Sequence, residues 1–295
     1  MMAPSATSNR YITPNGTDVH YISSGKQQGR VAVLLHGLGG STETFRDLLP
    51  IIPPDYHIIS VDIEGFGKTL LNQEEPLSFS RYVSDLHDLI THVQERPSAS
   101  TSGAVNGASS NNNSSEEPVL LVGHSLGAII SLQYAARFPS QVAGLLLLGS
   151  GRSVRGIPPA QQRMRDLAKA ARQKGMYAVA DIALMTNFPA DRGNDGVHDE
   201  EVRKAVSSCS AEAYAATAEL AASDDHHDPD YSMINCPAVF VAGDKDMISP
   251  PQRSEDISKL VGGPSEVVVV ESGHQMILQD IEGVKGALDK LLQLL

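Results

Sequence analysis

Positive charge is scarce in this sequence. Its 23 lysines and arginines are outnumbered by 35 aspartates and glutamates, which gives a formal net charge of −12. Nucleic acids and anionic membrane surfaces attract proteins through clustered basic residues. The composition therefore argues against both as partners of this protein.

Long hydrophobic runs are also missing. The longest run, Val142 to Leu148, is interrupted by Gly144 and is far shorter than the roughly 20 residues that span a bilayer. The N-terminal stretch MMAPSATSNR lacks the apolar segment of a secretory signal. We therefore predict no membrane association and a cytoplasmic location, where the two cysteines, Cys209 and Cys236, stay reduced.

Metal-ligand patterns are equally sparse. The segment His226 to Asp230, HHDPD, has no second ligand pair at the spacing of a metal site, so we interpret it as a polar loop. A phosphate-binding loop of the Walker type is excluded as well, because Asp62 occupies the position where Gly67-Lys68-Thr69 would need an upstream glycine. We expect neither a metal nor an organic cofactor.

The stretch Val119 to Arg137, VLLVGHSLGAIISLQYAAR, carries the strongest signal in the chain. Its first residues form a continuous apolar run typical of a buried strand, and apolar residues return at helical spacing after Gly127. The sequence thus predicts a tight strand-to-helix turn with Ser125 at its apex. Such a turn strains the serine backbone and requires small neighbours, a need that Gly123 and Gly127 meet.

Strands and helices alternate along most of the chain, which is 295 residues long and 41% hydrophobic. This alternation predicts an α/β fold with a mostly parallel sheet and right-handed crossovers. A hairpin over residues 12–22 precedes it, and helices are expected at 41–49, 78–96 and near the C-terminus. The predicted buried strands are Val31–Leu35, His57–Val61, Val119–Val122, Val142–Leu148, Ala238–Ala242 and Glu266–Val270.

Two segments depart from this alternation. Residues 97–117 are rich in Ser, Asn and Gly and are predicted to be a disordered surface loop, because the elements on both sides belong to one sheet. Residues 152–232 show four short helical patterns and no strand, which predicts an inserted helical cap. Residues 1–151 and 233–295 would then form the two parts of the core.

A serine nucleophile needs a base and a group that orients the base. Among the ten histidines, His274 is the preferred base, because it follows the last strand at the sheet edge where Ser125 is expected. His124 adjoins the serine but is expected to point elsewhere and to pack beneath the turn. The orienting carboxylate should follow a strand between Ser125 and His274, which leaves Asp244 and Asp246 as candidates.

The order Ser, Asp, His, the Gly-His-Ser-Leu-Gly turn and the His36-Gly37 loop after a strand together resemble the α/β-hydrolase superfamily over essentially the whole chain. This resemblance implies that Asp246 is the orienting acid. It also implies an oxyanion hole formed by the backbone N–H groups of Leu38 and Leu126.

The function implied by this resemblance is hydrolysis of a small-molecule ester or lactone through an acyl-enzyme on Ser125. Serine rather than aspartate at position 125 separates the chain from dehalogenase and epoxide hydrolase branches. The cap segment, with Met176-Tyr177-Ala178 and Tyr214-Ala215, resembles the 3-oxoadipate enol-lactonase-like group.

Two other functions remain on the same fold. One is a receptor that turns its ligand over slowly and whose cap binds a partner protein. Such binding would favour an exposed apolar cap surface, whereas this cap segment is richly charged. The other is a cofactor-free lyase or peroxidase. The sequence does not fix the oligomeric state, and a homodimer is one state compatible with it.

The start of the cap segment is basic in an otherwise acidic protein. Between Arg152 and Lys174 lie seven basic residues and one acidic residue, Asp166. Arg152 and Arg155 directly follow a strand end beside the expected active site. We predict that they bind a substrate carboxylate, as a carboxylate-bearing lactone or ester would require.

Overall fold

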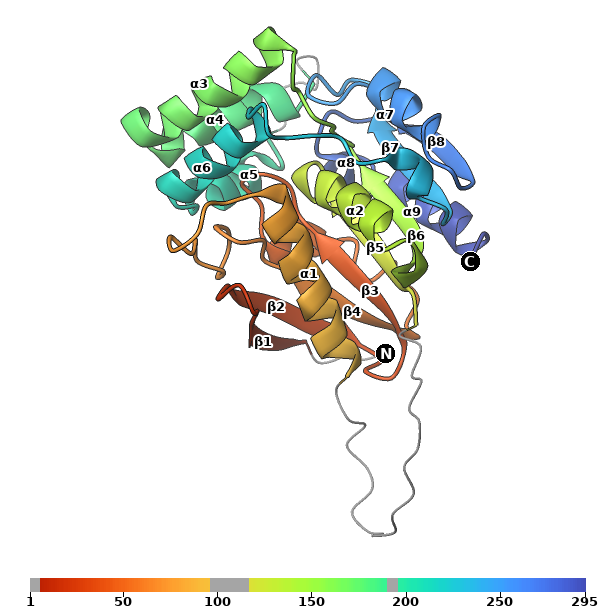
Figure 1. The fold of residues 1–295 in the computed structure, drawn as a ribbon. Helices are drawn as coiled ribbons and strands as arrows, with labels where there is room; N and C mark the ends of the chain where they lie inside the picture. Colours follow the sequence, from red (N-terminus) through yellow and green to blue (C-terminus); the bar gives the residue numbers. More distant parts are fainter. Residues whose placement is uncertain (1–5, 96–116, 190–195) are drawn as a thin grey trace, which may run out of the picture.

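The computed structural model describes residues 6–95, 117–189 and 196–295. One sheet has the strand order β1-β2-β4-β3-β5-β6-β7-β8 (Figure 1). Strands β3 to β8 run parallel, while β1 and β2 form the predicted antiparallel hairpin, with β1 at the sheet edge and β2 paired to β4. This confirms the predicted fold class. The strands are β1 (Thr7–Ile12), β2 (Asp18–Gly25), β3 (Arg30–Leu35), β4 (Tyr56–Val61), β5 (Val119–His124), β6 (Val142–Leu148), β7 (Ala238–Gly243) and β8 (Ser265–Val270).

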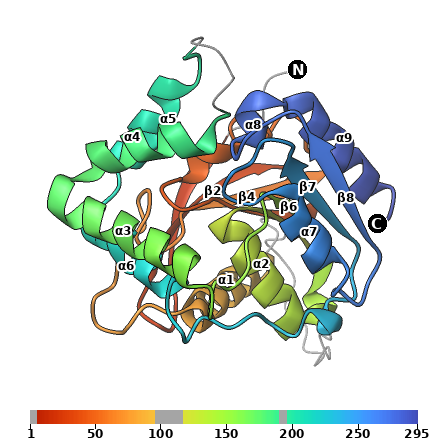
Figure 2. The same ribbon diagram turned by 90° about the horizontal axis from the view of Figure 1, so that it is seen from above.

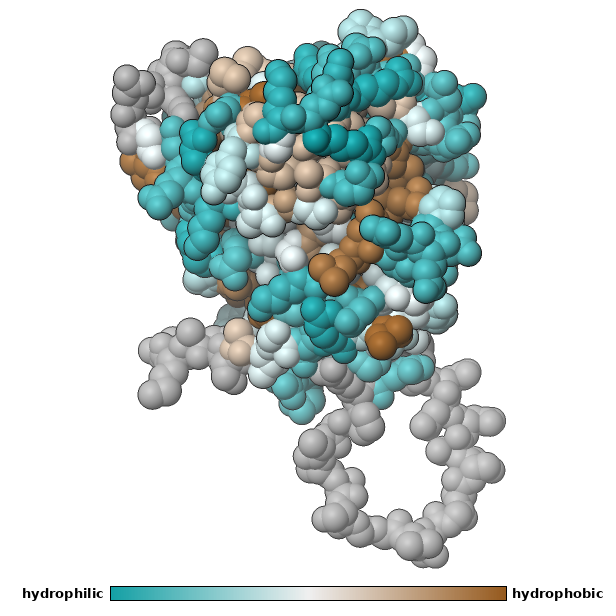
Figure 3. All heavy atoms as spheres, turned by 90° about the vertical axis from the view of Figure 1, so that its left-hand side faces the viewer, coloured by the Kyte–Doolittle hydropathy of each residue, from teal (hydrophilic) through white to brown (hydrophobic). Residues whose placement is uncertain are grey.

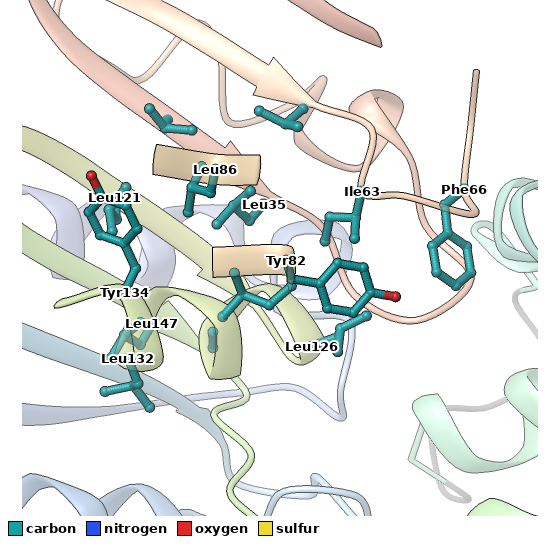
Figure 4. Close-up of a cluster of buried hydrophobic side chains, with 14 of the residues drawn as sticks. Leu35, Ile63, Phe66, Tyr82, Leu86, Leu121, Leu126, Leu132, Tyr134 and Leu147 are labelled. Carbon is teal, nitrogen blue, oxygen red and sulfur yellow. The ribbon is translucent and has the colours of Figure 1, made fainter. Parts of the chain in front are cut away.

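Helices cover both faces of the sheet. On one face, α1 (Phe79–Gln94), α2 (Leu126–Arg137) and α7 (Pro251–Ser258) pack on alternate strand residues such as Leu35 and Leu121 (Figure 4). On the other face lie α8 (Met276–Gln279) and α9 (Ile281–Leu292), next to the complementary set of strand residues. Burial of both sheet faces explains why the strands are continuously apolar. Short 3₁₀ helices complete the set: η1 (Thr42–Phe45), η2 (Pro139–Gln141) and η3 (Tyr231–Met233).

One expected helix is much shorter than predicted. The pattern at residues 41–49 indicated an α-helix, but the structure has only η1, followed by turns. Phe45 and Leu48 are fully buried three residues apart. That spacing places both side chains on one face of a tight 3₁₀-like turn, so the core is filled without a full helix.

Four helices lie between β6 and β7 in the chain: α3 (Pro158–Lys174), α4 (Met176–Asn187), α5 (Asp199–Ser207) and α6 (Ala211–Ala221). We call them the cap helices. They lie together at one side of the molecule, where α3 packs on α6 and α4 packs on α5 (Figures 1 and 2). The division into a core and a cap at residues 151/152 and 232/233 stays a prediction.

The side of the molecule on which the cap helices lie is largely hydrophilic near its top, and its apolar side chains form small groups (Figure 3). Within the described ranges no helix is long and apolar enough to cross a membrane. The predicted loop at 97–117 falls outside the described residues except for Glu117.

Candidate active site

Ser125 lies at the apex of the turn between β5 and α2, with φ 52° and ψ −107°. It is the only non-glycine residue with positive φ in the part of the chain that the structure describes. A Cβ atom on Gly123 would lie 2.6 Å from the carbonyl carbon of Gly127, and a Cβ atom on Gly127 would overlap the carbonyl oxygen of Leu35. The two glycines therefore allow the turn to press against both its own helix and strand β3.

The loop after β3 presents a backbone N–H beside this turn. His36 is fully buried; its Nε2 accepts a hydrogen bond of 3.0 Å from the Ile63 N–H, so its Nδ1 carries the proton and donates to the Gly37 carbonyl at 2.7 Å. Burial lowers the pKa of His36, which keeps the imidazole neutral in this role. Because C=O and N–H point in opposite directions in a trans peptide, this hydrogen bond turns the Leu38 N–H away from His36.

The N–H groups of Leu38 and Leu126 donate no hydrogen bond to any residue within 6–95, 117–189 or 196–295. Leu126 is the first residue of α2, where the helix dipole and the unpaired N–H groups favour negative charge. Both residues line the same cavity as Ser125. This arrangement suits an oxyanion, although the role of the two donors stays a prediction.

His274 and Asp246 are brought together from two different strand ends. His274 Nδ1 lies 2.7 Å from Asp246 Oδ2, and both side chains are buried. Burial alone would raise the pKa of Asp246, but attraction to His274 and hydrogen bonds from His274 and the N–H groups of Ser249 and Ile248 hold the pKa below its ordinary value. Asp244 instead accepts a 3.0 Å hydrogen bond from the Ser272 N–H, so it does not reach the imidazole.

His124 lies beneath the turn. Its Nε2 donates to the carbonyl oxygen of His274 at 2.8 Å, and the two rings lie 5.0 Å apart. Burial, followed by repulsion from His274, lowers the pKa of His124 to about 3. The residue therefore supports the backbone of His274 as a neutral donor.

A cavity of about 410 Å³ lies over Ser125 and His274 and is enclosed on its far side by residues of the cap helices. The Ser125 hydroxyl makes no hydrogen bond to another residue that the structure describes, which is common before a substrate aligns the groups. The cap also contacts the base directly: the His274 N–H donates to the carbonyl oxygen of Asn187, the last residue of α4, at 2.7 Å.

The predicted carboxylate ligands Arg152 and Arg155 both have partners within the protein. The guanidinium group of Arg152 donates twice to Asp228, and it lies over the Tyr231 ring. Arg155 is directed at the exposed His227 and does not line the cavity. Asp228, 76 residues away in the chain, already neutralises Arg152, so the structure does not favour these two residues as carboxylate ligands, and their role in binding stays a prediction.

Side chains of the segment His226 to Asp230 also form hydrogen bonds within the protein. His226 Nδ1 donates to the Ala221 carbonyl, and Asp228 also accepts from the Ser153 N–H and the Tyr231 hydroxyl. In the described ranges no three His, Cys, Asp or Glu side chains are grouped as a metal would need. The segment joins the two ends of the cap through side-chain contacts.

Two residues that the sequence reasoning did not single out belong to this site: Asn187 and Arg253. Arg253 lies on α7, which follows the loop of Asp246, and its side chain lines the cavity. No local pattern marks Asn187, because its partner His274 lies far away from it in the sequence.

A strained serine at a helix N-terminus, a buried histidine–carboxylate pair and a parallel sheet whose strand ends carry them define a class, the hydrolases built on an α/β sheet. Residues 32–284 match the sequence model of the alpha/beta hydrolase family. The chain belongs to that family, which confirms the resemblance drawn from its motifs.

Relatives cover nearly the whole chain. A 2-hydroxy-6-oxo-6-(2'-aminophenyl)hexa-2,4-dienoic acid hydrolase from Metapseudomonas resinovorans is 23% identical over 290 residues, which cover 96% of this chain and 90% of that protein. A malate-bound thermophilic esterase from Thermogutta terrifontis has the same fold, with a TM-score of 0.80, 20% identity and coverage of 97% and 98% of the two chains. An enol-lactonase from Burkholderia xenovorans gives a TM-score of 0.78 at 19% identity, with coverage of 97% and 100%.

Proposed function

We propose that this protein is a serine hydrolase that cleaves a carboxylic ester or lactone bond of a small molecule through an acyl-enzyme on Ser125. The observation that carries the proposal is the strained Ser125 at the start of α2, in one cavity with a His274 that is hydrogen-bonded to Asp246. The relatives named as a hydrolase, an esterase and an enol-lactonase support the same reaction class.

In the acylation half-reaction, His274 Nε2 takes the proton of the Ser125 hydroxyl as its oxygen attacks the ester carbonyl. Asp246 accepts the Nδ1–H of His274, which fixes the tautomer with a free lone pair on Nε2 and stabilises the imidazolium that forms. The negative oxygen of the tetrahedral intermediate is stabilised by the N–H groups of Leu38 and Leu126, and losing one such donor typically costs about 3 kcal/mol. The leaving alkoxide receives the proton from His274.

In the deacylation half-reaction, His274 removes a proton from water, and the hydroxide attacks the acyl carbonyl. The tetrahedral intermediate collapses, the C–O bond to Ser125 breaks, and the proton returns to the serine oxygen. The products are a carboxylic acid and an alcohol, or one hydroxy acid from a lactone. The cavity of about 410 Å³ suits a small substrate.

The test combines labelling with turnover. A fluorophosphonate probe should label one residue, Ser125, and a panel of aryl esters, methyl esters and lactones should be hydrolysed by the wild type but not by Ser125→Ala. Ser208→Ala is the matched control, since Ser208 lines the same cavity from the cap. Labelling of another residue, or undiminished turnover in Ser125→Ala, would contradict the proposal.

A further inference from the structure

One arginine at the wall of the catalytic cavity lacks a carboxylate partner among the residues that the structure describes. Arg152 is neutralised by Asp228, and Arg46, which also lines the cavity, is paired with Glu201 at 3.0 Å. Arg253 lines the same cavity, yet it forms no ion pair with any carboxylate in the described part of the chain. In a protein of net charge −12, a partly buried arginine without an acidic partner is unexpected.

The place of Arg253 in the fold brings it to the reacting groups. It is the third residue of α7, which follows β7 and the loop that holds Asp246. Its Nη1 donates to the carbonyl oxygen of Ile248 at 3.2 Å, which anchors the guanidinium beside the cavity, and its other N–H groups donate to none of the described residues.

Nearby carboxylates do not neutralise it. Asp246 attracts the guanidinium, but its Oδ2 is bonded to His274 and its Oδ1 accepts from the N–H groups of Ile248 and Ser249. Burial, and then repulsion from Arg163 and Arg152, act against the Asp246 attraction and lower the pKa of Arg253. The positive charge of Arg253 is thus incompletely neutralised, and a bound anion would stabilise it.

We propose that Arg253 is the specificity residue of this site and binds a carboxylate carried by the ester or lactone substrate. This inference rests on the proposed hydrolase function. A single unpaired guanidinium matches the single charge of a carboxylate, and its planar N–H groups suit the two carboxylate oxygens. Two acidic residues line the cavity: Glu43 lies on η1, which follows β3 on the other side of β5 from β7, and Glu201 is paired with Arg46.

This assignment replaces the arginines predicted from the sequence while keeping the substrate class. A carboxylate bound at Arg253 would lie next to the loop of Asp246, so the acyl or leaving group that bears it would extend toward α7 rather than toward the cap helix α3. If Arg253 binds the carboxylate, substitution of Arg253 abolishes the preference for a charged substrate. If the arginines predicted from the sequence bind it, substitution of Arg152 or Arg155 does so.

The experiment uses a matched pair of substrates, the mono-p-nitrophenyl ester of glutaric acid and its uncharged amide. The wild type should show a kcat/KM for the acid that is higher by about tenfold or more, the worth of one charge-assisted hydrogen bond. In Arg253→Gln the acid-to-amide ratio should fall to near unity, mainly through KM, and Arg253→Lys should restore part of it. The ratio in wild type should fall with rising salt.

Arg155→Gln is the matched control, because it removes an equal charge from a position outside the cavity. It should keep the wild-type ratio. Calorimetric titration of both compounds into Ser125→Ala, with and without Arg253→Gln, gives the same comparison without turnover.

The outcomes separate the two proposals. Equal hydrolysis of acid and amide by the wild type, abolished in Ser125→Ala, would overturn the carboxylate assignment and leave the hydrolase function standing. Equal losses for both compounds in Arg253→Gln would likewise overturn it. If neither compound is turned over, the function fails on this pair, and tighter binding of the acid to Ser125→Ala, lost with Arg253→Gln, would still support the assignment.

Discussion

The loops of the sheet edge and the cap helices build opposite walls of one cavity by different physical means. At the sheet edge, Ser125 is fixed by strained backbone, and His274 is fixed by buried hydrogen bonds. In the cap, charged side chains meet at the surface, as where Arg172 of α3 binds Glu212 and Glu219 of α6. The comparison teaches that the groups proposed to react are held by backbone geometry and buried hydrogen bonds, whereas the ion pairs on the cap surface can change at little cost in stability.

The largest difference between the two walls should appear in turnover. Ser125→Ala or His274→Ala should lower kcat by about 10³-fold to 10⁶-fold, because these groups act as one unit. Lys204→Ala, which alters an exposed cap residue at the cavity, should change kcat/KM by less than about tenfold. The measurement is steady-state kinetics with an aryl ester, with circular dichroism to establish folding. Similar losses at both walls would break the comparison.

Backbone crowding at the turn around Ser125 should affect the free energy of unfolding. Gly127→Ala forces a methyl group onto the Leu35 carbonyl and should lower the free energy of unfolding by about 3 kcal/mol or more. Gly286→Ala, in the middle of α9 with no atom near the added methyl, should raise it by about 0.5 to 1 kcal/mol. Urea titrations of both variants give the values. A tolerated alanine at position 127 would argue against the close contact with β3.

Buried histidine should make the sheet edge sensitive to acid. The folded-state pKa of His124, about 3, lies below the ordinary value of 6.5, so the unfolded chain binds the extra proton first and stability falls as the pH drops from 6.5 toward 3. His124→Gln should flatten that dependence by up to about 1.4 kcal/mol per pH unit. Unfolding titrations across pH 4 to about 7 test this.

The control for that titration is His227→Gln at the exposed end of the cap. If the two variants give equal slopes, His124 does not contribute to the acid sensitivity.

The smallest effect should come from the cap surface. The hydrogen bond from Arg172 holds the pKa of Glu212 below its usual range, yet both side chains are substantially exposed. Arg172→Gln should therefore lower the free energy of unfolding by less than about 1 kcal/mol, and the loss should shrink at high salt. A loss that salt does not reduce would mean that the cap depends on this arginine through packing.

Short-range patterns in the sequence predicted most of the elements. Continuous apolar runs predicted the six parallel strands within two residues of their ends, and the helix expected from residue 78 begins at Phe79 as α1. The prediction of a helix at 41–49 was wrong, because in the tertiary structure a short turn is enough to bury Phe45 and Leu48 in the core. Short-range patterns work where neighbours in the chain decide the conformation.

The sequence by itself determined the turn around Ser125, since its strain and its small neighbours lie within five adjacent residues. It left two carboxylates as candidates for the partner of His274, and only the fold placed Asp246 rather than Asp244 against the imidazole. The fold also joined Arg152 to Asp228 and placed Arg253 at the cavity with no carboxylate partner among the described residues. Such pairings depend on side chains that meet across many residues of chain, and no local spacing encodes them.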